Sequence, residues 1–155
     1  MACRPAVNEK ARLFYSYAHE DADLRDLLEK HLTALRRDGL IESWHDRDIL
    51  PGAAWNDSIS EHLEQADIIL LLISVDFLAS PYCTGTEMSR ALEREKRGEA
   101  TVIPILLRPV ELTNAPFRHL QFLPDKGKPV VEWRNRDEAF VDVARGIRRA
   151  VEARR

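Results

Sequence analysis

Residues 68–75 read Ile68-Ile69-Leu70-Leu71-Leu72-Ile73-Ser74-Val75, and this apolar run decides the fold class. A strand that is apolar at successive positions has both faces buried, as in a parallel sheet covered by helices on each side. The run is far shorter than the roughly 20 apolar residues that a membrane-spanning helix needs. We therefore predict that it is the central strand of a layered α/β domain.

Strand-like and helix-like segments alternate on both sides of this run. The other predicted strands are residues 13–17, 40–44, 101–107 and 130–131, and the predicted helices are near residues 24–35, 55–66, 84–97 and 136–151. Gly39 and Gly98 are expected to close the first and third of these helices, and Asn135 has the position of a cap for the last one. Such alternation predicts a parallel sheet with right-handed crossovers. We expect a flavodoxin-like three-layer fold, with five parallel strands in the order 2-1-3-4-5 and helices on both faces. Because proline has no N–H to donate, Pro104 indicates a free side or a bulge in the fourth strand.

The composition is that of one globular domain without a nucleic-acid partner. The chain has 155 residues, of which 45% are hydrophobic and 32% are charged, and its net charge is −3. A net negative charge argues against nucleic acid as the main partner. Residues 1–12 contain no apolar signal segment, and Cys3 and Cys83 belong to no CxxC pair. We therefore expect a cytoplasmic protein with reduced thiols and no membrane partner.

Several nucleotide-binding and metal-binding motifs are missing from the sequence. It contains no GxGxxG, GxxxxGK[ST] or GxSxG, and its five histidines lack ligand spacing, so we expect no metal site. A phosphoryl-receiver domain would share the expected strand order, and Glu20, Asp21 and Asp76 could supply its acidic residues. However, such a domain needs Lys-Pro after its last strand, whereas Lys128-Pro129 precedes the last predicted strand.

Five segments are weak signals separately but informative in their order along the chain. They are Phe14-Tyr15-Ser16-Tyr17, Asp46-Arg47-Asp48-Ile49-Leu50-Pro51-Gly52, Ser80-Pro81-Tyr82-Cys83-Thr84-Gly85-Thr86-Glu87, residues 102–108 and residues 135–140. Together they resemble the motifs of a bacterial-type TIR (Toll/interleukin-1 receptor) domain. On this resemblance we assign residues 12–155 to the domain and residues 1–11 to an N-terminal extension.

The resemblance implies an enzyme that cleaves the nicotinamide–ribose bond of NAD+, with Glu87 as the catalytic residue. It further implies that Tyr17, His19, Trp55 and Cys83 contact NAD+, which is the substrate, so that no cofactor is expected. Glu87 also follows the predicted central strand, and open α/β sheets bind ligands beyond the carboxyl ends of their strands. The products would be nicotinamide with ADP-ribose or with a cyclic ADP-ribose.

The residues alone leave other roles open for this segment. Thr84-x-x-Glu87 has the spacing of a helix capping box, in which the glutamate only satisfies a backbone N–H. Alternatively, Ser80-Pro81 caps the helix and places Glu87 in its second turn. In the same way Trp55 could be a core residue, and Cys83 could be a small buried apolar side chain.

The resemblance also implies homotypic association with other TIR domains. The expected contact is the loop that carries Asp46, Arg47, Asp48, Pro51 and Gly52; the alternative is a solvated loop closed by a Pro-Gly turn. By the same resemblance the enzyme acts in bacterial immune signalling or cell suicide. The alternative function is a non-catalytic adaptor that recruits other TIR domains.

Overall fold

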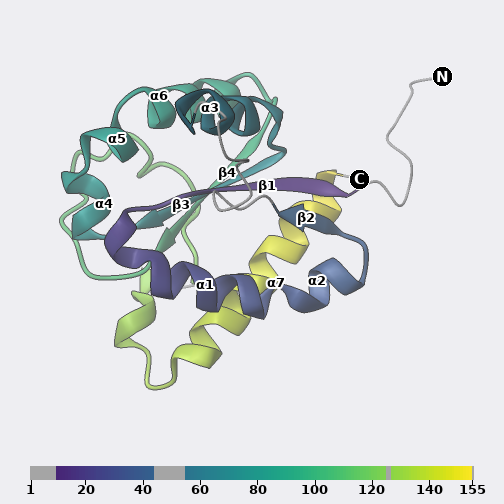
Figure 1. The fold of residues 1–155 in the computed structure, drawn as a ribbon. Coiled ribbons are helices and arrows are strands. Elements are labelled where there is room, and N and C mark those ends of the chain that lie inside the picture. The colour runs from purple at the N-terminus through teal and green to yellow at the C-terminus, as the bar shows by residue number, and fades with distance from the viewer. Residues whose placement is uncertain (1–9, 44–54, 125–126, 155) are drawn as a thin grey trace.

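The protein is described by a computed structural model, which covers residues 10–43, 55–124 and 127–154. A parallel sheet of four strands lies at its centre, in the order β2-β1-β3-β4 (Figure 1). The strands are β1 (Ala11–Ser16), β2 (Ile41–Ser43), β3 (Ile68–Ile73) and β4 (Thr101–Leu106). This order matches the first four strands of the expected order.

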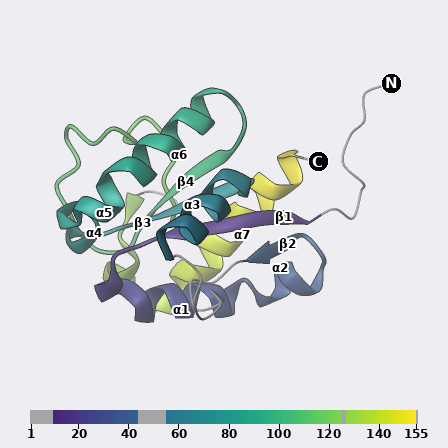
Figure 2. The same cartoon turned by 45° about the horizontal axis from the view of Figure 1, so that its top comes forward.

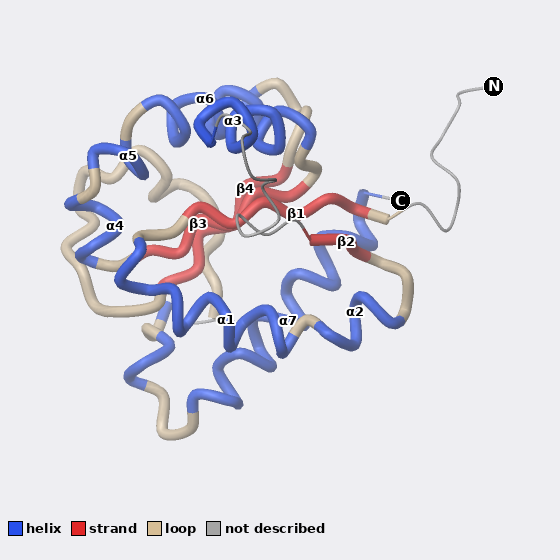
Figure 3. Tube along the Cα trace, viewed as in Figure 1, coloured by secondary structure: helices blue, strands red, loops and turns tan. Residues whose placement is uncertain are grey.

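Helices cover both faces of the sheet, which gives the expected flavodoxin-like three-layer arrangement (Figure 3). One layer holds α3 (Trp55–Gln65), α4 (Val75–Ala79), α5 (Pro81–Thr84) and α6 (Thr86–Lys96). The other layer holds α1 (Ala22–His31), α2 (Thr33–Arg37) and α7 (Arg136–Arg154), and the short 3-10 helix η1 (His19–Asp21) leads into α1. Among the described residues, no helix is both long and apolar enough to cross a membrane.

Successive residues of β3 pack into two separate cores. Ile68, Leu70 and Leu72 belong to the core under α1 and α7, whereas Ile69, Leu71 and Ile73 belong to the core under α3 and α6. All six are at most 1% exposed, because side chains alternate across a strand and both faces of this one are covered. The apolar run of the sequence is thus explained up to Ile73, where the strand ends.

Pro104 lacks an N–H on the side of β4 that faces away from β3, which agrees with the free side that the sequence indicated at this residue. Its carbonyl accepts a hydrogen bond from the Leu123 N–H at 2.9 Å, and the Leu106 N–H donates to the Leu123 carbonyl at 2.8 Å. The backbone nitrogen and carbonyl of Pro104 therefore point away from β3, so its missing N–H interrupts no pairing with that strand. On this side the described residues form only an isolated parallel bridge, between Ile105 and Leu123.

The predicted last strand at residues 130–131 is wrong. Val130–Glu132 form a 3-10 helix, η4, in which the Glu132 N–H donates to the Pro129 carbonyl at 3.0 Å. Pro129 has a fixed φ and no N–H, so it favours a turn here over a further ladder. Val131 still reaches the sheet, because its N–H donates to the Leu107 carbonyl at 3.1 Å.

Helix ends follow the local signals of the sequence. Gly39 and Gly98 have φ values of 72° and 73°, a left-handed conformation that glycine adopts readily after a helix. At the start of α7, the Asn135 side chain accepts a hydrogen bond from the Asp137 N–H at 2.8 Å. These ends are confirmed because capping depends on residues close in sequence.

Candidate functional site

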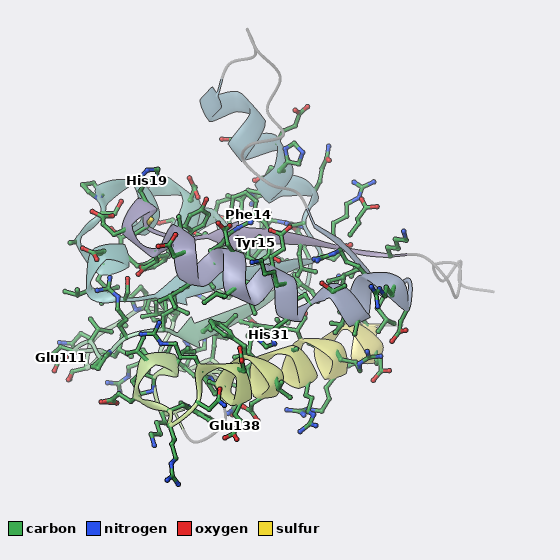
Figure 4. The ribbon with its side chains drawn as sticks, turned by 60° about the horizontal axis from the view of Figure 1, so that its bottom comes forward. Phe14, Tyr15, His19, His31, Glu111 and Glu138 are labelled. Atoms are coloured by element: carbon green, nitrogen blue, oxygen red, sulfur yellow. The ribbon has the colours of Figure 1, made fainter. Side chains whose placement is uncertain are left out.

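The candidate site lies at the edge of the sheet where the strands end. η1 follows β1, α4 follows β3, and Arg108 lies just beyond β4. The strands are parallel, so their carboxyl ends lie at one edge of the sheet, and α4 and the start of α1 lie at the same end of the molecule (Figure 2). His19 lies at this end, just ahead of α1, and is exposed (Figure 4). Ligands of open α/β sheets bind at this edge.

Two short helical segments connect β3 to the helix that carries Glu87. The Ser74 side chain caps α4 by accepting from the Phe77 N–H at 3.1 Å. Ser80 caps α5 in the same way, accepting from the Cys83 N–H at 3.2 Å, and Pro81 occupies the first turn. Because α5 ends at Thr84, the helix that Ser80-Pro81 begins does not continue to Glu87.

Glu87 lies in the first turn of α6, not in a capping box. The Thr84 hydroxyl donates to the Ser80 carbonyl at 2.8 Å, and Gly85 is the residue that precedes the helix. The capping-box reading is therefore wrong, and the Ser80-Pro81 cap is present but belongs to α5. Glu87 is partly buried, with its Oε2 atom shielded from solvent. The helix dipole favours a carboxylate in a first turn.

The face of α6 that carries Glu87 is the face bound to α3. Arg90 and Arg94 follow Glu87 at spacings of three and seven residues, which places all three on one side of the helix. Arg90 Nη2 donates to the Glu64 carboxylate at 2.7 Å. Arg94 is 7% exposed, and its Nη1 donates to the carbonyls of Leu63 at 2.7 Å and Ala66 at 2.8 Å. These contacts fix the two helices to each other.

Trp55 is the first residue of α3, and α3 lies against α6. Both helices belong to crossovers between parallel strands, so both begin near the edge where the strands end. The Trp55 side chain is outside the described part of the structure, so its predicted contact with NAD+ stays a prediction. The predicted assembly residues Asp46, Arg47, Asp48, Pro51 and Gly52 also lie outside the described residues.

Cys83 is a buried thiol close to several carboxylates. Burial raises its pKa, and a hydrogen bond with Ser80 opposes this effect. The charges of Glu87, Asp21 and Glu20 raise the pKa further, so these three carboxylates lie within electrostatic reach of the sulfur. The side chain is 2% exposed and packs in the core under α6. A protonated, buried thiol acts as a small apolar side chain rather than as a nucleophile.

Tyr17 lies on the other side of the sheet from Cys83. Its ring packs against the core under α1 and α7, and Arg25 Cζ lies 5.8 Å from the ring centroid. The structure therefore brings Glu20 and Asp21 towards the thiol but places the Tyr17 ring elsewhere. Its predicted contact with NAD+ stays a prediction.

Four residues at this edge form a polar network that the sequence did not predict. Asp21 accepts hydrogen bonds from the Ser74 hydroxyl and from Arg108 Nε, the latter at 3.1 Å. Arg108 also pairs with Asp76. The sequence suggested Asp21 and Asp76 only as acidic residues of a receiver-like site. Instead a guanidinium binds both, and the described residues contain no His, Cys, Asp or Glu group that could hold a metal ion.

Comparison with known proteins assigns the family. A sequence model described as the TIR domain matches residues 13–143. The chain belongs to the TIR domain family. Uncharacterized protein y4lF of Sinorhizobium fredii (strain NBRC 101917 / NGR234) is 51% identical to it over 138 residues. That alignment covers 89% of this TIR domain and 43% of the relative, so the chain spans less than half the length of the relative.

Solved TIR domains share the fold at low sequence identity. The TIR domain of the Toll-related receptor TRR-2 from Hydra magnipapillata has a TM-score of 0.62 and 23% identity, and the match covers 91% of this chain and 96% of that domain. The TIR domain heterodimer of RPS4 and RRS1 has a TM-score of 0.55 and 15% identity, with 93% and 99% of the two chains covered. The TIR domains of the activated Roq1 resistosome, which recognises the pathogen effector XopQ, have a TM-score of 0.54 and 20% identity, with 87% and 84% covered.

Proposed function

We propose that this TIR domain cleaves the nicotinamide–ribose bond of NAD+, with Glu87 as its catalytic residue. The observation that carries the proposal is the position of Glu87. It is a partly buried carboxylate in the first turn of α6, at the edge of the sheet where open α/β folds bind ligands. Its helix is held to α3 by Arg90 and Arg94, so the carboxylate has a rigid support.

The proposed chemistry needs one well-placed negative charge. Nicotinamide leaves as a neutral ring, and the ribose develops the character of an oxocarbenium cation in the transition state, as in glycoside hydrolysis. Glu87 would stabilise that cation and hold ribose hydroxyls through charge-assisted hydrogen bonds. Attack by water yields ADP-ribose, whereas attack by the adenine or a hydroxyl of the same substrate yields a cyclic product.

The proposed setting is immune signalling or cell suicide in a bacterial cytoplasm, through association with other TIR domains. A bacterial relative at 51% identity supports the bacterial part of this setting, and the solved TIR heterodimer supports association through TIR surfaces. The loop of residues 46–52 is the proposed contact. The net charge of −3 argues against nucleic acid as the main partner.

The test compares nicotinamide release from NAD+ by the wild type, by Glu87→Gln and by Glu138→Gln. Glu87→Gln keeps the size of the side chain and removes its charge, so we expect a folded protein without turnover. Glu138 is exposed on α7, in the layer on the other side of the sheet (Figure 4), so its variant should retain full activity. Normal turnover by folded Glu87→Gln would overturn the catalytic role. A wild type that assembles but releases no nicotinamide would instead indicate the adaptor function.

A further inference from the structure

The network around Asp21 joins the ends of three adjacent strands. Asp21 ends η1, which follows β1, while Ser74 follows β3 and Arg108 lies just beyond β4. Arg108 Nε and Nη2 lie 3.1 Å and 3.0 Å from Asp21 Oδ1, and the Ser74 hydroxyl donates to Asp21 Oδ2. Both oxygens of this carboxylate are therefore bound, each from a different strand end.

The network joins two buried side chains to two partly exposed ones. Asp21 is 2% exposed and Ser74 is fully buried, whereas the Arg108 and Asp76 side chains are 31% and 33% exposed. A buried carboxylate is costly unless a charge and hydrogen bonds compensate it, and Arg108 and Ser74 supply both. The hydrogen bond with Asp76 is the largest cause that raises the pKa of Arg108, followed among the stabilising contacts by the Asp21 charge.

The same groups hold the segment that leads to Glu87. Ser74 caps α4 with the oxygen whose hydroxyl proton is donated to Asp21, and Arg108 pairs with Asp76 in the first turn of α4. In turn α4 packs against α5, and α5 packs against α6. The distance along the chain from Ser74 to Glu87 is bridged by these two short helices alone. A shift at Ser74 is therefore passed to Glu87 through few intermediate contacts.

We propose that Asp21 and Arg108 are positioning residues for the candidate site. They fix the start of α4 relative to β1 and β4, and so set the place of Glu87 and of η1, which carries His19. This inference rests on the proposed cleavage of NAD+. A displacement of about 1 Å in a catalytic group lowers turnover by as much as 10²-fold, so a loosened network should act on kcat more than on KM.

The experiment measures kcat and KM for NAD+ in Asp21→Asn, in Arg108→Gln and in the double variant. We expect each single variant to lose about tenfold in kcat, with KM changed less than about twofold. The kcat of the double variant should be no lower than that of the less active single variant, because removing both charges leaves no unpaired buried ion. Arg148→Gln is the matched control, since Arg148 forms an exposed ion pair with Asp38 at 2.8 Å on the far layer. It should behave as wild type.

A milder variant covers the case in which the charge-removing changes prevent folding. Arg108→Lys keeps the positive charge beside Asp21 but cannot reproduce the two-pronged contact with Asp21 and Asp76. We expect it to fold and to lose several-fold in kcat. Wild-type kcat in the folded single variants, or losses that multiply in the double variant, would overturn the proposal.

Hydrogen exchange separates this inference from the proposed function. The backbone N–H groups of residues 75–80 and 82–84 should exchange faster in Asp21→Asn and Arg108→Lys than in the wild type and in Arg148→Gln, because the start of α4 is less firmly held. This readout needs no turnover. If the assembled wild type releases no nicotinamide, the proposed function fails, and the network is then judged by exchange alone. Unchanged exchange in residues 75–84 would overturn the network.

Discussion

Gly85→Ala tests whether the break between α5 and α6 sets the position of Glu87. A Cβ atom at residue 85 would lie 2.7 Å from the Pro81 carbonyl oxygen, a distance that real Cβ contacts essentially never show. The oxygen belongs to the backbone of α5, so α5 and α6 must separate by several tenths of an ångström. Overpacking of this kind costs about 1–3 kcal/mol. Because Glu87 follows two residues later, the same separation moves its carboxylate, and we expect a loss of about tenfold in kcat.

Gly98→Ala is the matched control, at the opposite end of the same helix. Gly98 has a φ of 73°, and a Cβ atom there would meet nothing within 4 Å. Alanine in this left-handed conformation costs about 1–2 kcal/mol. For a domain of this size each kcal/mol lowers Tm by about 2–4 °C, so the two variants should melt at similar temperatures. They should differ only in activity.

The assay measures Tm by thermal unfolding and the initial rate of nicotinamide release, at a temperature where both variants are fully folded. We expect Gly98→Ala to keep the kcat of the wild type. Equal losses of activity in the two variants would show that stability, not the position of Glu87, limits turnover. Wild-type kcat in folded Gly85→Ala would refute the link between the helix junction and catalysis.

Three further predictions concern substrate contact, assembly and pH. Trp55→Ala should raise the KM for NAD+ more than it lowers Tm; unfolding with unchanged kinetics in the folded fraction would make Trp55 a core residue. Specific activity should rise with protein concentration, because association is expected to complete the site. The double variant Pro51→Ala, Asp48→Lys should weaken association, measured by sedimentation, and activity together. Constant specific activity on dilution of a strictly monomeric protein would contradict assembly as the switch. Arg90 lowers the pKa of Glu64 below its ordinary 4.5, chiefly through their hydrogen bond, so the pair stabilises the fold above pH 4.5 and its contribution disappears as pH falls below that value. The Tm difference between the wild type and Arg90→Gln should therefore be small at neutral pH and vanish in acid, and a difference that persists in acid would contradict this origin.

Features that depend on neighbours in sequence were predicted well. The period of the apolar residues located β3, and the glycines after α2 and α6 marked the helix ends, because burial pattern and backbone preference are local properties. Asn135 was recognised as a cap for the same reason. The parallel direction of the strands followed from the alternation of strands and helices, and the first four strands have the order of the flavodoxin-like fold that we expected.

Two errors arose where a competing hydrogen bond between residues close in sequence outweighed the signal that we used. Val130 and Val131 favour a strand by propensity, but the hydrogen bonds around Pro129 form a turn instead. Thr84 and Glu87 have capping-box spacing, but the Thr84 hydroxyl donates to Ser80 within α5. In both cases the competing partner could not be identified from the spacing alone.

By itself, the sequence determined the class of the fold, its central strand and the family motif that contains Glu87. Only the tertiary structure decided how the site is held. Asp21 meets Ser74 across 53 positions of the chain and Arg108 across 87 positions. No local rule connects residues that far apart. They meet because β1, β3 and β4 lie side by side in register, so the residues that follow the three strands are brought to one edge of the sheet.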